Sequence, residues 1–114
     1  MIEANLFTAL STLVNGRVFP DVAPSATTLP YITFQQKGGK PVNFLGAEYA
    51  DKKNARFQIN VWCATRIEAA TLSRSIENLM VQSPLLGVIE GGSIATYDEE
   101  TNTRGAMQDF SFWS

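Results

Sequence analysis

The chain of 114 residues contains no histidine and a single cysteine, Cys63. Without histidine it lacks the commonest general base and the usual triads that activate a nucleophile. One cysteine excludes an internal disulfide, and the lack of histidine excludes the mixed Cys/His zinc patterns as well. These two absences argue against the most frequent kinds of enzyme and against a structural zinc site.

Long apolar runs and a strong charge of either sign are also missing. No run approaches the ~20 residues of a transmembrane helix, and the first ten residues carry an acid where a signal peptide carries lysine or arginine. Nine basic residues stand against eleven acidic ones, for a net charge of −2, whereas nucleic-acid-binding proteins usually present a basic face. We therefore expect one cytosolic domain over residues 1–114, with no membrane contact. Glu48 and Asp51 interrupt the loose basic cluster, which consists of Lys37, Lys40, Lys52, Lys53 and Arg56.

The hydrophobic pattern predicts two amphipathic helices. Apolar residues recur at helical spacing between Ile2 and Val14, which places them on one face. Thr65 and Glu68 match the capping box that opens a helix, and the Ser-Pro pair at residues 83–84 ends it. The second helix is predicted to bury Ala69, Leu72, Ile76, Leu79 and Met80. Its predicted outer face carries Ser73, Arg74, Glu77 and Asn78.

Strands are predicted both before and after the second helix in the sequence. Residues 55–64 alternate strictly between apolar and polar side chains, and residues 31–36 are rich in β-branched and aromatic types. Residues 86–90 and 93–97 form either one bulged strand or two pieces broken at the glycine pair 91–92. Residues 107–113 return after the polar turn 98–105 as an antiparallel partner. The predicted order is α-β-β-α-β-β, an α+β fold with a mainly antiparallel sheet and two helices packed on one face.

None of the reactive side chains forms a recognisable catalytic or metal-binding pattern. The acidic run 98–100 lacks the spacing of an EF-hand loop and is predicted to be a solvated turn. Glu48 and Asp51 have no partner base, and Cys63 lies on the apolar face of its strand, where a thiol is unreactive. The two glycine pairs lack the lysine and the spacing of nucleotide-binding loops. We expect no catalytic residue, no metal, no cofactor and no small-molecule substrate.

The side of strand 55–64 opposite the core is the candidate functional surface. It carries Arg56, Gln58, Asn60 and Trp62, and Trp113 occupies the equivalent side of the last strand. The tryptophans are explained either by partial burial under a sheet edge or loop, or by contact with another subunit, where tryptophan and arginine are enriched. Residues 38–54 are long for a loop and are predicted to project and bury apolar residues on a neighbour. The apolar interface candidates in that segment are Phe44, Leu45 and Tyr49.

Several segments together resemble a known family. They are VFPDVAP at residues 18–24, LPYITFQ at 29–35, RFQINVW at 56–62, and Ala64-Thr65 with Glu68-Ala69 at the start of the second helix. This combination is similar to the small tail completion proteins of long-tailed phages and prophages, which include tail-to-head joining proteins. The resemblance covers nearly the whole chain.

The resemblance implies a structural, non-enzymatic role in the virion. Such proteins resemble tail terminators, which form a ring, commonly a hexamer, at the head-proximal end of the tail. The implied partners are other copies of the chain, the tail tube protein and the head connector, with DNA passing through the ring. Synthesis would take place in the cytoplasm of the bacterial host. The alternative is a ferredoxin-like RNA-binding module, which the acidic composition and the lack of its aromatic motif disfavour.

Overall fold

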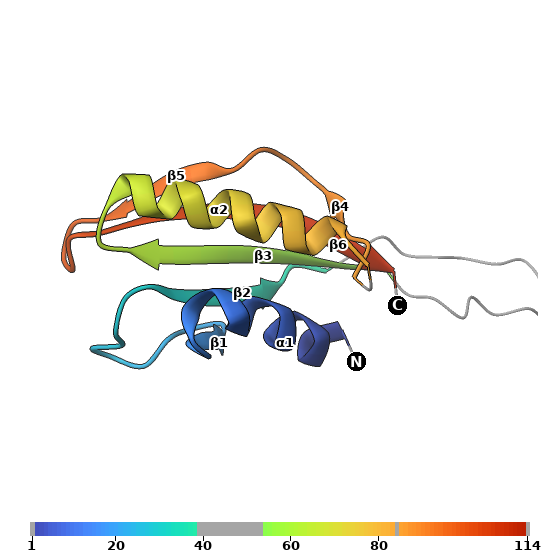
Figure 1. The fold of residues 1–114 in the computed structure, drawn as a ribbon, viewed down its shortest axis with the longest axis horizontal. Helices are drawn as coiled ribbons and strands as arrows, with labels where there is room; N and C mark the ends of the chain where they lie inside the picture. The colour runs from blue at the N-terminus through green and yellow to red at the C-terminus, as the bar shows by residue number, and fades with distance from the viewer. Residues whose placement is uncertain (1, 39–53, 84, 114) are drawn as a thin grey trace, which may run out of the picture.

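A computed structural model describes residues 2–38, 54–83 and 85–113 of the chain (Figure 1). These residues form two helices and six strands in the order α-β-β-β-α-β-β-β. The predicted α+β class is confirmed, and two short strands are added to the predicted order. The elements are α1 (Ile2–Val14), β1 (Val18–Pro20), β2 (Tyr31–Gln36), β3 (Asn54–Cys63), α2 (Arg66–Val81), β4 (Val88–Ile89), β5 (Ile94–Asp98) and β6 (Thr103–Trp113).

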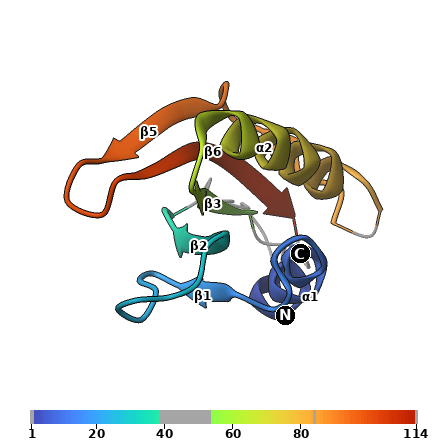
Figure 2. The same ribbon diagram turned by 60° about the vertical axis from the view of Figure 1, so that its left-hand side comes forward.

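The strands form one sheet in the order β1-β2-β3-β6-β4, and β5 also pairs with β6. The β1–β2 pairing is parallel and all other pairings are antiparallel. The long β3 and β6 pair along their length, from Asn54 opposite Trp113 to Cys63 opposite Arg104. Both helices lie on the same side of this sheet (Figure 2). The sheet therefore has one face covered by helices and one open face.

The core lies between the helices and the covered face. Strict alternation along β3 buries its odd-numbered residues from Ala55 to Cys63, because successive strand side chains point to opposite faces. Phe110 and Phe112 of β6 extend the same layer, and the ring of Phe112 meets that of Phe57 at a centroid distance of 6.1 Å. The helices contribute Leu6, Leu10, Val14, Ala69, Ile76 and Met80.

The start of α2 confirms part of the predicted capping box. The Thr65 hydroxyl accepts a hydrogen bond from the Glu68 amide at 3.2 Å, which satisfies one of the free amides of the first turn. Glu68 also acts on the end of β3, because its charge and a hydrogen bond to the thiol contribute to the raised pKa of Cys63. Thus the capping residue and the end of β3 are tied to the same turn of the helix.

The prediction for one side chain of α2 is wrong. Ser73 is buried rather than exposed, and its hydroxyl lies 2.7 Å from the Ser93 hydroxyl in the link between β4 and β5. Ser73 follows the stripe of Ala69, Ile76 and Met80 at helical spacing, so its position is on the core side. A serine fits there because it has a hydrogen-bond partner, which removes most of the cost of burying a hydroxyl.

The segment after α2 consists of two separate strands, which resolves the choice left open by the sequence. β4 pairs with Ser111 and Phe110, and β5 pairs with residues 103–107. The buried Gln108 closes the gap between them, because its amide nitrogen donates to the Gly91 carbonyl at 2.8 Å and to Glu77 of α2 at 3.2 Å. The β5–β6 hairpin is confirmed, with a turn of residues 99–102 that is shorter than predicted. Within the described residues neither helix has the length and apolar composition needed to cross a membrane.

Candidate subunit interface

The central part of the open face is built from side chains of β2, β3 and β6. The register places Tyr31 beside Trp62 and Thr33 beside Asn60 in the β2–β3 pair. On the other side of β3, Asn60 lies beside Met107. The predicted candidates Arg56, Gln58, Asn60 and Trp62 thus form one row along the middle of the sheet, flanked by β2 and β6.

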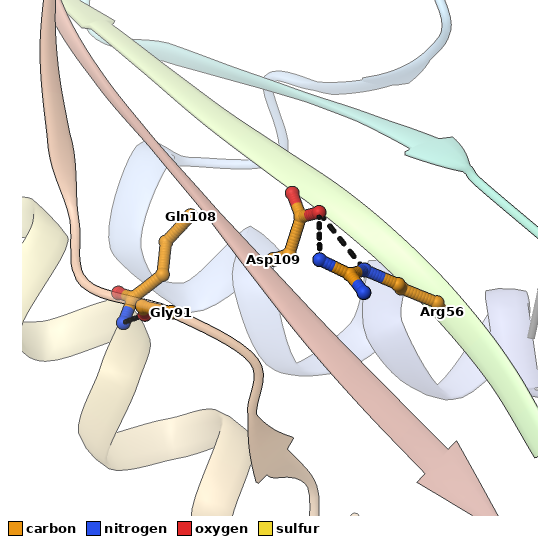
Figure 3. Close-up of polar contacts among 4 residues, drawn as sticks. All are labelled: Arg56, Gly91, Gln108 and Asp109. Atoms are coloured by element: carbon orange, nitrogen blue, oxygen red, sulfur yellow. Dashed lines mark hydrogen bonds and ion pairs between the residues drawn. The ribbon is translucent and has the colours of Figure 1, made fainter.

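Arg56 has a partner within its own sheet. Its guanidinium donates to the Asp109 carboxylate from Nε at 3.0 Å and from Nη2 at 2.9 Å (Figure 3). The Asp109 and Gln108 side chains leave β6 on opposite sides, so the ion pair belongs to the open face and the Gln108 contacts to the covered face. Further along the row, the Asn60 amide donates to Gln58 at 3.4 Å. The polar side chains of the open face are therefore held in place by contacts with one another. A partner would bind side chains that are already ordered.

Trp62 is half-buried and packs against the neighbouring strand. It lies opposite Gly105 of β6, where a Cβ atom would come within 2.9 Å of the indole Cε3 and 2.7 Å of the Val61 carbonyl oxygen. Glycine at this position lets the indole approach the β6 backbone. One part of the Trp62 side chain thus contacts β6, and the rest faces solvent.

Trp113 lies on the same face at the far end of β6. It is 44% exposed and pairs in register with Asn54, whereas Trp62 pairs with Gly105. Eight strand residues span about 27 Å, so the two tryptophans occupy opposite ends of the open face. The predicted Phe44, Leu45 and Tyr49 lie outside the described residues.

A hollow of about 270 Å³ lies at the Trp62 end of the open face. Its carboxylates come from segments far apart in the sequence, namely Asp21 after β1 and Asp98 at the end of β5. The pKa of Tyr31 is raised, first by burial and second by the negative charge of Asp98. Asp98 was predicted to belong to a solvated turn, and it is instead half-buried. The other lining residues are Val22, Ala23, Tyr31, Thr33, Asn60 and Trp62.

An exposed apolar strip at the β4–β5 edge was not anticipated. Leu86, Val88, Ile89 and Ile94 all lie within residues 86–94 and are each more than two-fifths exposed. Edge strands with exposed apolar side chains favour pairing with another chain. Sequence alternation could not identify this strip, because β4 has only two residues.

The described residues were compared with the side-chain clusters that can hold a metal ion. They contain no group of three or more His, Cys, Asp or Glu side chains placed to hold a metal. Burial raises the pKa of the Cys63 thiol to about 12, and the charge of Glu68 and its hydrogen bond to the thiol act in the same direction. Cys63 is fully buried, which confirms the prediction that it belongs to the core.

The geometry describes a small α+β protein whose sheet is covered by helices on one face only. A family model described as tail completion protein gp17 matches residues 6–114, and the chain belongs to that family. It therefore has a structural role in the phage tail and contacts other tail or head proteins.

Comparisons with solved structures support the fold. One solved structure matches with a TM-score of 0.57 over 98% of this chain and 92% of that chain, at 11% sequence identity. At this identity the likeness concerns the fold alone. A search of curated proteins gives no match.

Proposed function

We propose that this chain completes or caps the tail tube at its head-proximal end and joins it to the head connector. It acts as a ring-shaped homo-oligomer, commonly a hexamer in the tail terminators it resembles, with DNA passing through the ring. The role is structural and involves no catalysis. The match of the tail completion family over residues 6–114 is the observation that carries the proposal.

The open face of the sheet gives the ring a candidate contact surface. A closed ring needs a heterologous interface, in which two different patches of neighbouring subunits meet. The first patch is the open-face row with the exposed tryptophan: Arg56, Gln58, Asn60, Trp62 and Trp113. The second is the segment 38–54, which carries Phe44, Leu45 and Tyr49. Half-buried polar side chains around a tryptophan fit the composition of subunit contacts better than that of a solvated surface.

The RNA-binding alternative has less support. Such modules place aromatic side chains on adjacent central strands within a basic surface. Here Arg56 on the central strand β3 is paired with Asp109, and Trp62 lies opposite a glycine on β6. The net charge of −2 also opposes binding to a phosphate backbone.

Oligomeric state and tube binding test the proposal together. Native mass spectrometry and light scattering over a concentration series measure self-association, and co-sedimentation with purified tail tubes measures docking. We expect a discrete ring in solution, or a monomer that becomes a ring on the tube. A chain that stays monomeric and also fails to bind tubes would overturn the proposal.

A further inference from the structure

The hollow beside Trp62 combines negative charge with aromatic surface. Asp21 and Asp98 supply two carboxylates, and Tyr31 and Trp62 supply two aromatic rings. Among the described residues that line the hollow there is no lysine or arginine. Carboxylates attract cations through charge, and the faces of aromatic rings attract them through the ring quadrupole. The lining therefore favours a group that is positively charged and partly apolar.

The carboxylates of Asp21 and Asp98 can still form hydrogen bonds or ion pairs with such a group. Within the described residues the Asp21 carboxylate has no hydrogen bond or ion pair, since Arg56–Asp109 is the one salt bridge there. The Asp98 carboxylate accepts one hydrogen bond, from the Glu100 amide to Oδ1 at 3.0 Å. The Asp21 backbone amide donates to the Phe34 carbonyl at 2.9 Å, which fixes Asp21 at the rim of the hollow.

Thr33 adds a hydroxyl group to the lining of the hollow. It lines the hollow and is 8% exposed, and its hydroxyl forms no hydrogen bond with another described residue. A donor that enters the hollow can form a hydrogen bond with this hydroxyl.

We propose that this hollow receives a lysine or arginine side chain from a neighbouring protein subunit of the phage tail. Lysine and arginine carry a charged donor on an apolar stem, which matches carboxylates at the rim, a threonine hydroxyl and aromatic rings. The volume of about 270 Å³ is below the roughly 300–1,000 Å³ of pockets that enclose small-molecule ligands. A hard metal ion would require six or more oxygen ligands and not an aromatic lining. The inference rests on the proposed assembly role and assigns a specific contact to it.

The first test uses small cations that imitate the two side chains. The full-length chain is titrated with n-butylammonium and n-propylguanidinium at constant ionic strength, and the indole N–H signals of both tryptophans are followed by NMR. We expect a saturable shift at Trp62, with a dissociation constant on the order of millimolar, and little change at the distant Trp113. Asp21→Asn and Asp98→Asn should each weaken binding at least threefold. Glu99→Gln removes the same charge beside Asp98 but outside the hollow, and it should leave binding unchanged.

Three results of the titration would overturn the inference. They are no shift at Trp62, an equal shift with uncharged n-butanol, and equal binding by the Asp21→Asn/Asp98→Asn double variant. Unchanged amide spectra in the absence of cation confirm that the variants are folded.

The second test asks whether a protein side chain is the occupant. The double variant and Glu99→Gln are compared with wild type in self-association and tube binding. We expect at least tenfold weaker assembly for the double variant and less than a twofold change for Glu99→Gln. Equal assembly of the double variant and wild type would overturn the inference and leave the proposed function standing, and cation binding in that case would indicate a site for a free cation. A wild-type chain that neither self-associates nor binds tubes would overturn the proposed function and the inference with it.

Discussion

The two faces of the β3–β6 pair differ in almost every physical property although they are built from alternate residues of the same strands. On the covered face, Phe57, Phe110 and Phe112 are fully buried under the helices. On the open face, the same strands present an ion pair, a half-buried tryptophan and a tryptophan that is 44% exposed. The covered face therefore accounts for folding and leaves the open face available for assembly.

Truncating a side chain of the covered face should strongly destabilise the fold. Phe57 is fully buried and its ring lies 6.1 Å from the centroids of both Phe34 and Phe112. Phe57→Ala should lower the free energy of unfolding by about 3–5 kcal/mol, through lost burial and the cavity left behind. Urea unfolding followed by fluorescence measures this value. The comparison variant Trp113→Ala on the open face should cost much less, and equal losses for the two would contradict the division between the faces.

A substitution at Gly105 tests whether the Trp62 side chain packs closely against β6. A Cβ atom there would lie 2.7 Å from Thr96 Oγ1 and 2.9 Å from the indole of Trp62. Gly105→Ala should therefore destabilise the chain by about 1–3 kcal/mol, as overpacking does. Gly92→Ala is the matched control, because nothing lies within 4 Å of its Cβ position. If thermal unfolding gives the same result for both variants, Trp62 is not held against β6 as described.

The ion pair of the open face should contribute little to stability. The Arg56 side chain is 42% exposed, and exposed pairs of this kind contribute about 0–1 kcal/mol. Arg56→Ala, Asp109→Ala and the double variant form a cycle that isolates the coupling energy by denaturant unfolding. A coupling energy above this range would mean that the open face also supports folding.

The buried thiol of Cys63 on the covered face should make the stability of the fold depend on pH. Its pKa is raised from 9.0 to about 12 in the folded chain, first by burial and then by Glu68. The raised pKa favours the protonated thiol, so this contribution to stability is complete below pH 9 and is lost as the pH rises from about 9 towards 12. Wild type should therefore lose stability relative to Cys63→Val between pH 8 and pH 10, while both variants share all other titrations. Parallel pH profiles would contradict the burial of an ionisable thiol.

The sequence predicted the parts of the fold that follow a regular period. The alternation of β3, the apolar face of α1 and the Thr65 cap were all readable because each depends on residues close in sequence. β1 and β4 have three and two residues, which are too few to show a period in the sequence. They form strands because they pair with β2 and β6. Ser73 was misplaced because polarity outweighed its helical spacing, and its partner Ser93 lies in a different element.

The candidate interface was predictable only in part. Alternation placed Arg56 and Trp62 on the side opposite the core, which the structure confirms. It could not show that Arg56 pairs with Asp109 or that Trp62 rests on Gly105, since both contacts cross between strands. The hollow was beyond sequence reasoning because Asp21, Thr33 and Asp98 meet only after the sheet has formed.

Side-chain footprinting of the assembled protein measures directly whether the open face is covered on assembly. Hydroxyl radicals oxidise exposed side chains, and mass spectrometry gives the oxidation rate of each residue for the free chain and for the chain bound to tail tubes. We expect slower oxidation of Trp62, Met107 and Trp113 on the open face after assembly. Phe7 on α1 and Tyr97 on the helix side of β5 should change less. Bound chain with unchanged oxidation of the three open-face residues would contradict the central claim that this face is the assembly surface.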